Sequence, residues 1–262
     1  MKKFLSTVFL ILVIGVVAYQ LKSQIFPPAP CSESIPYTLG TFATQFGISK
    51  DYFLSALTDA EAIWEKPFGK NFFTYEPTSS DATVLKINLV YDYRQQATSD
   101  LASLGIVVTD DRASYDALKI KYNELQTEIT TAKNNYVLSR SESARVKINN
   151  MVDEINSMVV VLNRLADTLN LSVQKYNTTN TARGESFEEG VYISDGTNRK
   201  IDIYEFSSRA KLVRVLAHEL GHALGLDHVA DPKAIMYSFN QGNNNALTTA
   251  DIEELKAKCQ IK

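Results

Sequence analysis

Residues 216–237 read LAHELGHALGLDHVADPKAIMY and contain the most specific motif of the chain. Five of its residues follow the order HExxHxxGxxH, namely His218, Glu219, His222, Gly225 and His228. The whole chain of 262 residues contains three histidines, so every histidine belongs to this motif. Imidazoles gathered at this spacing predict a metal site.

The spacing also predicts how these side chains meet. If residues 209–224 form a helix, His218 and His222 lie one turn apart on the same face and present two imidazoles to one ion. Gly225 can take the left-handed conformation that ends a helix and turns the chain back. That reversal would bring His228 round as a third ligand. Three imidazoles leave the fourth tetrahedral position of Zn²⁺ open for water, as in a catalytic site.

Peptide-bond hydrolysis is the chemistry that such a site favours. Zinc lowers the pKa of its bound water towards ~7 and polarises a peptide carbonyl. Glu219 would take the proton from that water and later deliver it to the leaving amine. A bare HExxH also arises by chance on structural helices, but the added Gly225 and His228 make a chance match rare.

These residues resemble the metzincin zinc endopeptidases and, within them, the matrixins. In that family a methionine downstream of the third histidine forms a turn beneath the metal, and Met236 in DPKAIMY matches this position. The resemblance implies an α+β fold, the zincin domain, with a twisted mixed sheet packed against the active-site helix. It also implies that Tyr237, Ser238 and Phe239 line the substrate pocket. Ser238 departs from the family, which usually has proline there, so the shape of this wall stays open.

The N-terminal segment and the charge bear on location. Residues 1–23 begin with Lys2 and Lys3 and continue as a mostly apolar run, between a signal peptide and a membrane-spanning helix in length. An uncleaved anchor is slightly favoured by the positive-inside tendency. Either reading places the remainder outside the cytoplasm, after a proline-rich linker over residues 24–34. The net charge of −3 gives no footprint for nucleic-acid binding.

The two cysteines, Cys31 and Cys259, frame the chain that follows this linker. In an oxidising compartment they favour a disulfide that ties the two ends of the domain together, although sequence alone cannot show their proximity. Matrixins also use a propeptide cysteine to cap the zinc. Because PAPCSES around Cys31 lacks the surroundings of that motif, latency through Cys31 is the weaker interpretation.

A matrixin-like catalytic domain is expected over residues 35–93 and 187–262. Apolar residues at helical spacing predict a helix over residues 49–64, with Ser49 as its cap. Apolar and polar residues alternate over residues 85–93, which predicts a half-buried strand.

Two further strands are predicted over residues 187–193 and 201–206. The resemblance implies that one of them forms the edge of the sheet, where an extended substrate pairs as an additional strand. Sequence order favours residues 201–206 for this position. A last helix is predicted over residues 247–254, with Thr248 as its cap and Asp251 in its first turn.

Residues 94–186 are expected to form an insertion, an antiparallel α-helical coiled-coil hairpin. Two heptad seams carry this prediction: Leu118, Tyr122, Leu125, Ile129, Ala132 and Tyr136, then Ile148, Val152, Ile155, Val159, Leu162, Ala166 and Leu169. Ser139 and Glu142 form a capping-box pattern, so the turn is expected near residues 137–143. Helices of about 26 residues would project roughly 40 Å. The hairpin could pack on the catalytic domain or bind a coiled-coil partner through residues 111–170.

The prediction is therefore a zinc-dependent endopeptidase that acts on protein or peptide substrates, secreted or tethered by its N-terminal helix. One catalytic Zn²⁺ is expected, and the second, structural zinc of matrixins is not, because no further histidines remain. Acidic and asparagine-rich loops could hold Ca²⁺, but their spacing does not support a calcium site. Two alternatives stay open. One is a catalytically silent zinc-binding scaffold whose hairpin binds a partner, and the other is a processing protease with a narrow substrate.

Overall fold

The structure is a computed structural model that describes residues 31–79, 81, 83–106, 112–174, 189–196, 198–238 and 245–261. The predicted signal peptide or anchor over residues 1–23, and most of the linker after it, lie outside the described residues. Within the described ranges, no helix has both the length and the apolar character needed to cross a bilayer.

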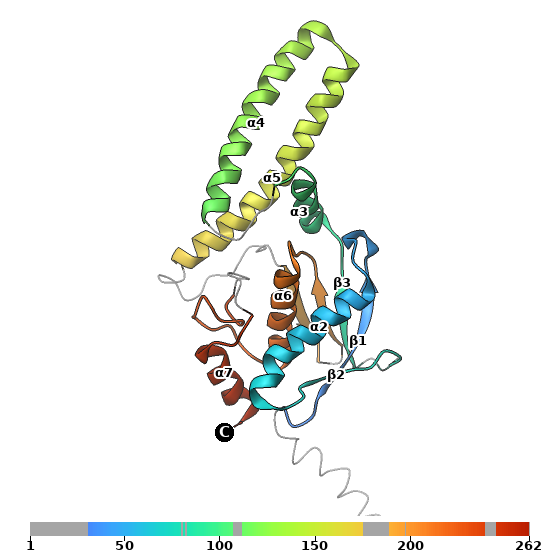
Figure 1. Cartoon of the computed structure of the whole chain (residues 1–262), viewed down its shortest axis with the longest axis vertical. Helices are drawn as coiled ribbons and strands as arrows, with labels where there is room; N and C mark the ends of the chain where they lie inside the picture. Colours follow the sequence, from blue (N-terminus) through green and yellow to red (C-terminus); the bar gives the residue numbers. More distant parts are fainter. Residues whose placement is uncertain are drawn as a thin grey trace, which may run out of the picture.

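A five-stranded sheet forms the base of the part of the molecule that carries the three histidines; we call it the zinc-binding part, after the ion that the sequence predicts there (Figure 1). Its strands are β1 (Ile35–Phe42), β2 (Phe73–Tyr75), β3 (Leu85–Leu89), β4 (Gly190–Ser194) and β5 (Arg199–Ile203). They lie in the order β2-β1-β3-β5-β4. Neighbours are parallel except β4, which runs antiparallel to β5 and forms one edge of the sheet. This mixed α+β arrangement is consistent with the expected zincin fold.

Helices α2 (Lys50–Glu65) and α6 (Arg209–Ala223) pack on each other and on the sheet (Figure 1). The bounds of both helices confirm the predictions from the sequence, including Ser49 as the cap of α2. Trp64 of α2 is fully buried, and its Nε1–H donates to the carbonyl of Ala217 in α6 at 2.8 Å. Two short 3₁₀ helices, η1 (Thr44–Phe46) and η2 (Lys66–Phe68), flank α2.

The predicted strand over residues 85–93 is too long, because β3 ends at Leu89. The backbone N–H of Arg94 donates to the side chain of Asp92 at 2.9 Å, which makes Asp92 the cap of helix α3 (Tyr93–Ser103). Tyr93 therefore begins a helix, although its spacing continues the alternation of the strand. An N-terminal cap overrides a short apolar alternation because it satisfies backbone donors that a helix otherwise leaves unpaired.

Helices α4 (Arg112–Ser139) and α5 (Glu142–Gln174) pack side by side and project away from the sheet, and we call this pair the helical arm (Figure 1). They turn within the predicted region, where Arg140 adopts a left-handed φ of +47°. Ser139 is the last residue of α4, so the predicted capping box does not begin α5 at that position. Whether the pair meets a partner as a coiled coil stays a prediction.

Three residues of the predicted α4 seam are buried, Leu118, Leu125 and Ile129, whereas the seam of α5 is shifted. Its buried apolar residues are Ile148, Met151, Met158, Val161 and Leu165. Val159, which the heptad reading placed in the seam, is 37% exposed. The reason is that α5 packs against α3 as well as α4, so it buries a different face from the one a two-helix seam requires.

Helix α7 (Thr249–Cys259) closes the zinc-binding part near the C-terminus (Figure 1). Thr248 and Asp251 form a reciprocal capping box at its start, as predicted, although the helix extends five residues beyond Glu254. Its last residue, Cys259, is bonded to Cys31, with Cα atoms 5.2 Å apart. The disulfide thereby joins the entrance of β1 to the end of α7, and it indicates an oxidising compartment.

Candidate metal centre

Helix α6 presents the first two histidines of the motif. Ser208 caps the helix by accepting a hydrogen bond from the backbone N–H of Lys211 at 3.3 Å. One side of the helix is anchored in the core by three fully buried leucines, Leu212, Leu216 and Leu220. His218 and His222 project one turn apart on the other side, as the spacing predicted.

Gly225 ends α6 and reverses the chain. Its φ of +86° lies in the left-handed region that side chains disfavour. Its backbone N–H donates to the carbonyl of His222 at 2.9 Å, and that of Leu226 donates to the carbonyl of Gly221 at 3.0 Å. This is the Schellman pattern of a helix end. The reversal carries His228 back towards α6.

The three imidazoles converge on one point. The Nε2 atoms lie 3.2 Å apart for His218 and His222, 3.2 Å for His222 and His228, and 3.3 Å for His218 and His228. Nδ1 of His218 lies 2.7 Å from the carbonyl oxygen of Ile235, and Nδ1 of His222 lies 2.9 Å from that of Leu226. Because a carbonyl only accepts, each of these Nδ1 atoms carries the proton and leaves Nε2 free to bind a metal.

These separations fit a zinc ion. Tetrahedral Zn²⁺ with Zn–N bonds of ~2.0–2.1 Å holds two nitrogen ligands ~3.3–3.4 Å apart. Burial, followed by the neighbouring His222, lowers the pKa of His218 to about 3, so this imidazole is neutral at physiological pH. His228 is exposed, which leaves the group open to solvent on that side. The three histidines could therefore hold Zn²⁺ with an accessible fourth position.

Glu219 is a residue of α6, and its side chain lies against the edge strand β4. Its side chain is 4% exposed. A β-carbon added to Gly190, the first residue of β4, would lie 3.1 Å from Cγ of Glu219 and 2.9 Å from Cγ2 of Val215. Glycine at this position thus allows the strand to approach the carboxylate closely.

Met236 lies in a turn packed against α6, at the position that the family resemblance assigned. It is fully buried, and a β-carbon added to Gly221 would lie 2.3 Å from its Sδ. Gly221 directly precedes His222, so the methionine contacts the helix between its two histidines. The preceding residue, Ile235, provides the carbonyl that orients His218. The turn therefore supports the site through packing and through a hydrogen bond.

Asp251 of α7 holds this turn by accepting hydrogen bonds from its backbone, a role that the sequence did not reveal. Its buried carboxylate accepts the backbone N–H groups of Ile235 and Met236, each at 2.9 Å, besides that of Thr248 at 2.8 Å. Only the position of Asp251 in the first turn of the helix was predicted from the sequence. The pattern offers no signal for the contact with Met236, because a capping box reports only on its own helix.

Arg214 holds the same turn from the side of α6. This side chain is 1% exposed, and its Nη2 donates to the carbonyl of Ala234. Burial lowers the pKa of Arg214. The sequence pattern gives no signal for this role of Arg214, since a cation on an otherwise apolar helix face is usually solvated. The methionine turn is thus held by polar contacts from two helices.

Helix α7 also stabilises the loop that carries His228. Nζ of Lys258 lies 2.6 Å from Oδ2 of Asp227, and this contact lowers the pKa of Asp227. The backbone N–H of Asp227 donates to Glu254 at 3.3 Å. Cys259 ends the same helix, so the disulfide anchors the helix that holds the loop of the third histidine.

The predicted edge strand is corrected by the sheet order. β5 lies inside the sheet between β3 and β4, so residues 201–206 cannot offer an unpaired edge. β4 takes that position and lies next to Glu219. Sequence order misled this prediction because β4 and β5 form a hairpin whose first strand is the outer one.

The residues expected to line a substrate pocket are partly described. Tyr237 is 4% exposed and pairs with Val229 in an isolated bridge, and its place in a pocket wall stays a prediction. Ser238 follows it at intermediate exposure. Phe239 lies outside the described residues.

Comparisons with known proteins indicate a family. The family model for matrixins matches residues 105–258, more than half of the chain, a stretch that contains α6, the histidine loop and α7. The resemblance that the sequence analysis noted over residues 35–93 lies outside this match. Human neutrophil collagenase is 43% identical over 54 residues, which is 20% of this chain and 12% of the collagenase. No solved structure matches the chain. The chain belongs to the matrixin family.

Proposed function

We propose that this protein is a zinc-dependent endopeptidase whose metal ligands are His218, His222 and His228 and whose general base is Glu219. The observation that carries the proposal is the convergence of three Nε2 atoms at 3.2–3.3 Å, beside a buried carboxylate at the sheet edge. Membership of the matrixin family supports a metalloprotease. The specific residue roles are the proposal.

When bound, zinc supplies Lewis-acid polarisation of the scissile carbonyl and an acidified water. The remaining steps belong to the chain. Hydrogen bonds to the carbonyls of Ile235 and Leu226 fix the orientation of His218 and His222. Glu219 takes a proton from the attacking water and returns it to the leaving amine. Its position in α6, directly after the ligand His218, permits this role.

The substrate is proposed to bind as an additional strand along β4. This strand is the edge of the sheet, and its first residue packs against Glu219. Backbone hydrogen bonds along such an edge recognise an extended peptide irrespective of sequence, while pockets for alternate side chains provide selectivity. Tyr237 and Ser238 are the proposed residues of one such pocket.

Export is part of the same proposal. The disulfide between Cys31 and Cys259 requires an oxidising compartment to persist. Residues 1–23 would direct the chain there, as a removed signal or as a retained anchor. The neutrophil collagenase match covers too little of that protein to transfer its substrate.

The decisive experiment compares the wild type with Glu219→Gln in cleavage of an unfolded protein substrate, with bound zinc measured in parallel. Glutamine keeps the shape of the side chain and removes the base, so kcat should fall by about 10²–10⁴-fold while zinc content stays equal. A chelator should abolish cleavage by the wild type, and added zinc should restore it.

The same data decide between the alternatives. Cleavage that survives in Glu219→Gln would come from a contaminant or from another base. Wild type that binds zinc without cleaving unfolded protein would instead favour the narrow processing protease or the silent scaffold. A wild-type protein that binds no zinc contradicts the proposal itself.

A further inference from the structure

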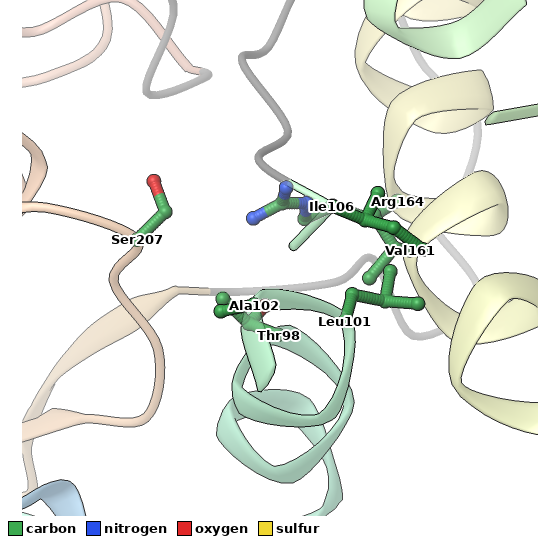
Figure 2. Close-up of a pocket in the computed structure, with 7 residues that line it drawn as sticks. All are labelled: Thr98, Leu101, Ala102, Ile106, Val161, Arg164 and Ser207. Carbon is green, nitrogen blue, oxygen red and sulfur yellow. The ribbon is translucent and has the colours of Figure 1, made fainter. Parts of the chain in front are cut away.

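The helical arm meets the zinc-binding part at a junction that contains a buried ion pair, Arg164 with Glu205. Figure 2 shows Arg164 of α5 extending towards Ser207, with Thr98 and Ala102 of α3 nearby. A cavity of about 80 Å³ lies among these residues. Leu101, Ile106 and Val161 also line this cavity, so polar bonds at the junction act beside apolar contacts that do not fill it completely.

Arg164 is a buried cation that faces two carboxylates from the zinc-binding part. Its side chain is 4% exposed, and its Nη1 lies 2.9 Å from Oε2 of Glu205 and 3.7 Å from Oε1 of Glu189. Glu205 is itself 1% exposed. Loss of the guanidinium would leave two buried or half-buried carboxylates without this compensating charge, and they would have to move to reach water.

Glu205 belongs to the segment that leads into the active-site helix. Oγ1 of Thr98 donates to its other carboxylate oxygen at 2.8 Å. The backbone N–H of the next residue, Phe206, donates to the side chain of Gln95 at 3.0 Å. Ser208, two positions later, caps α6. Helices α3 and α5 together therefore fix the point at which α6 begins.

Glu189 precedes the edge strand. Its backbone carbonyl accepts the N–H of Glu205 at 3.2 Å. The next residue, Gly190, begins β4 and packs against Glu219. The side chain of Glu189 thus links Arg164 to β4. This strand packs against the proposed base, Glu219, and would bind the substrate.

We propose that Arg164 is a positioning residue: by pairing with Glu205 and Glu189, it holds β4 and the start of α6 in the arrangement that peptide hydrolysis requires. The arm is then a structural support of the substrate-binding edge, and its placement sets how that edge is presented. The kinetic part of this inference rests on the proposed function. The structural part, the placement of β4, does not.

The kinetic test compares Arg164→Met with Lys147→Met in the full chain. Lys147 is the matched control, because it is a cation of the same helix paired with a glutamate, Glu128, at 2.9 Å, but it is exposed and lies farther out on the arm. Arg164→Met should raise KM about tenfold with a smaller change in kcat. Lys147→Met should change neither constant, and Arg164→Lys, which keeps the charge, should recover most of the loss. Equal effects of the two methionine variants would overturn the inference.

Amide hydrogen exchange provides a readout that does not depend on activity. Arg164→Met should accelerate exchange at residues 190–194 and 204–208, while exchange in α2 stays at the wild-type rate. Acceleration throughout the zinc-binding part would mean general destabilisation, and unchanged exchange at β4 would mean no positioning. Either result contradicts the role of Arg164. If the wild type does not cleave the unfolded substrate, KM cannot be compared, and hydrogen exchange alone decides the inference.

A double variant separates positioning from the burial of unpaired charge. Arg164→Met combined with Glu205→Gln removes one carboxylate that the single variant leaves uncompensated. Positioning predicts that KM stays raised, because the bond between α5 and the segment before α6 is still absent. Return of KM to the wild-type value would show that only the stranded charge mattered.

Discussion

The zinc-binding part and the helical arm each have an apolar core, and the two cores are assembled in opposite ways. The core of the zinc-binding part unites residues as distant along the chain as Tyr37, Ile87, Leu216 and Leu255. The buried core of the arm unites α4 and α5 with α3, three helices that follow one another in the chain. The arm can therefore form from local contacts, whereas the zinc-binding part must close across it.

The junction between these cores differs from both because it contains buried polar contacts. Among the described residues, Arg164 pairs with Glu205, and the backbone N–H of Phe206 donates to the side chain of Gln95. Polar contacts of this kind contribute little net stability but fix one geometry, because an unpaired partner is costly. We therefore expect each core to provide its own stability and the junction to provide alignment.

The largest expected effect comes from truncating one buried methionine in each core. Met236→Ala and Met158→Ala remove side chains that are both fully buried, so each should cost about 2–5 kcal/mol of unfolding free energy. Each variant should lose stability in the part of the molecule whose core it truncates. Met236→Ala should lower zinc retention and the stability reported by Trp64, the single tryptophan, which lies in the zinc core. Met158→Ala should reduce the helical signal of the arm and leave zinc content unchanged.

Zinc retained after dialysis, Trp64 fluorescence and far-ultraviolet circular dichroism measure these outcomes. Val146→Ala is the control, because this arm side chain is 46% exposed and its truncation should cost little. If Met158→Ala removed zinc as strongly as Met236→Ala does, the two cores would be one cooperative unit and the comparison would fail.

Loss of the disulfide should have a smaller effect, confined to the zinc-binding part. Cys31→Ser with Cys259→Ser should lower its unfolding free energy by about 2–4 kcal/mol, chiefly by freeing the unfolded chain. Zinc retention should fall too, since Cys259 ends the helix that holds Asp227 beside His228. The midpoint of the arm transition should not move.

Reduction of the wild type by a thiol provides an independent check on the serine pair. The two preparations should unfold at the same temperature by Trp64 fluorescence. A shift of the arm transition in either preparation would show that the disulfide acts beyond the zinc-binding part.

The sequence predicted the features that depend on local spacing. The ends of α6, the reversal at Gly225 and the meeting of the three histidines follow from a helical repeat and a glycine cap, which involve neighbouring residues only. The caps at Ser49 and Thr248 were predicted for the same reason. The arm turned near the expected residues because charged and polar residues interrupt both seams there.

The predictions that were wrong concern which elements become neighbours in the fold. The seam of α5 shifted, with Met158 buried and Val159 exposed, because α3 became a second partner of that helix. The edge position went to β4 because sheet order is set by the hairpin, not by distance along the chain from α6. Arg164 and Glu205 are 41 positions apart, and no repeat connects them.

The smallest expected effect concerns an exposed ion pair near the tip of the arm, and it contrasts with the buried pair at the root. Nε of Arg145 donates to Oε2 of Glu142 at 2.8 Å, and this bond lowers the pKa of the Glu142 carboxyl. A carboxyl whose pKa is lower in the folded state stabilises the arm above its ordinary pKa, and that contribution is lost as pH falls through the folded value. Both side chains are more than half exposed, so solvent screening keeps the contribution small. Titration of the Glu142 carboxyl by NMR should show the lowered pKa, and Arg145→Met should return it towards the ordinary value without changing KM. A change in KM in this variant would mean that the whole arm, and not only its root at Arg164, is coupled to the zinc site.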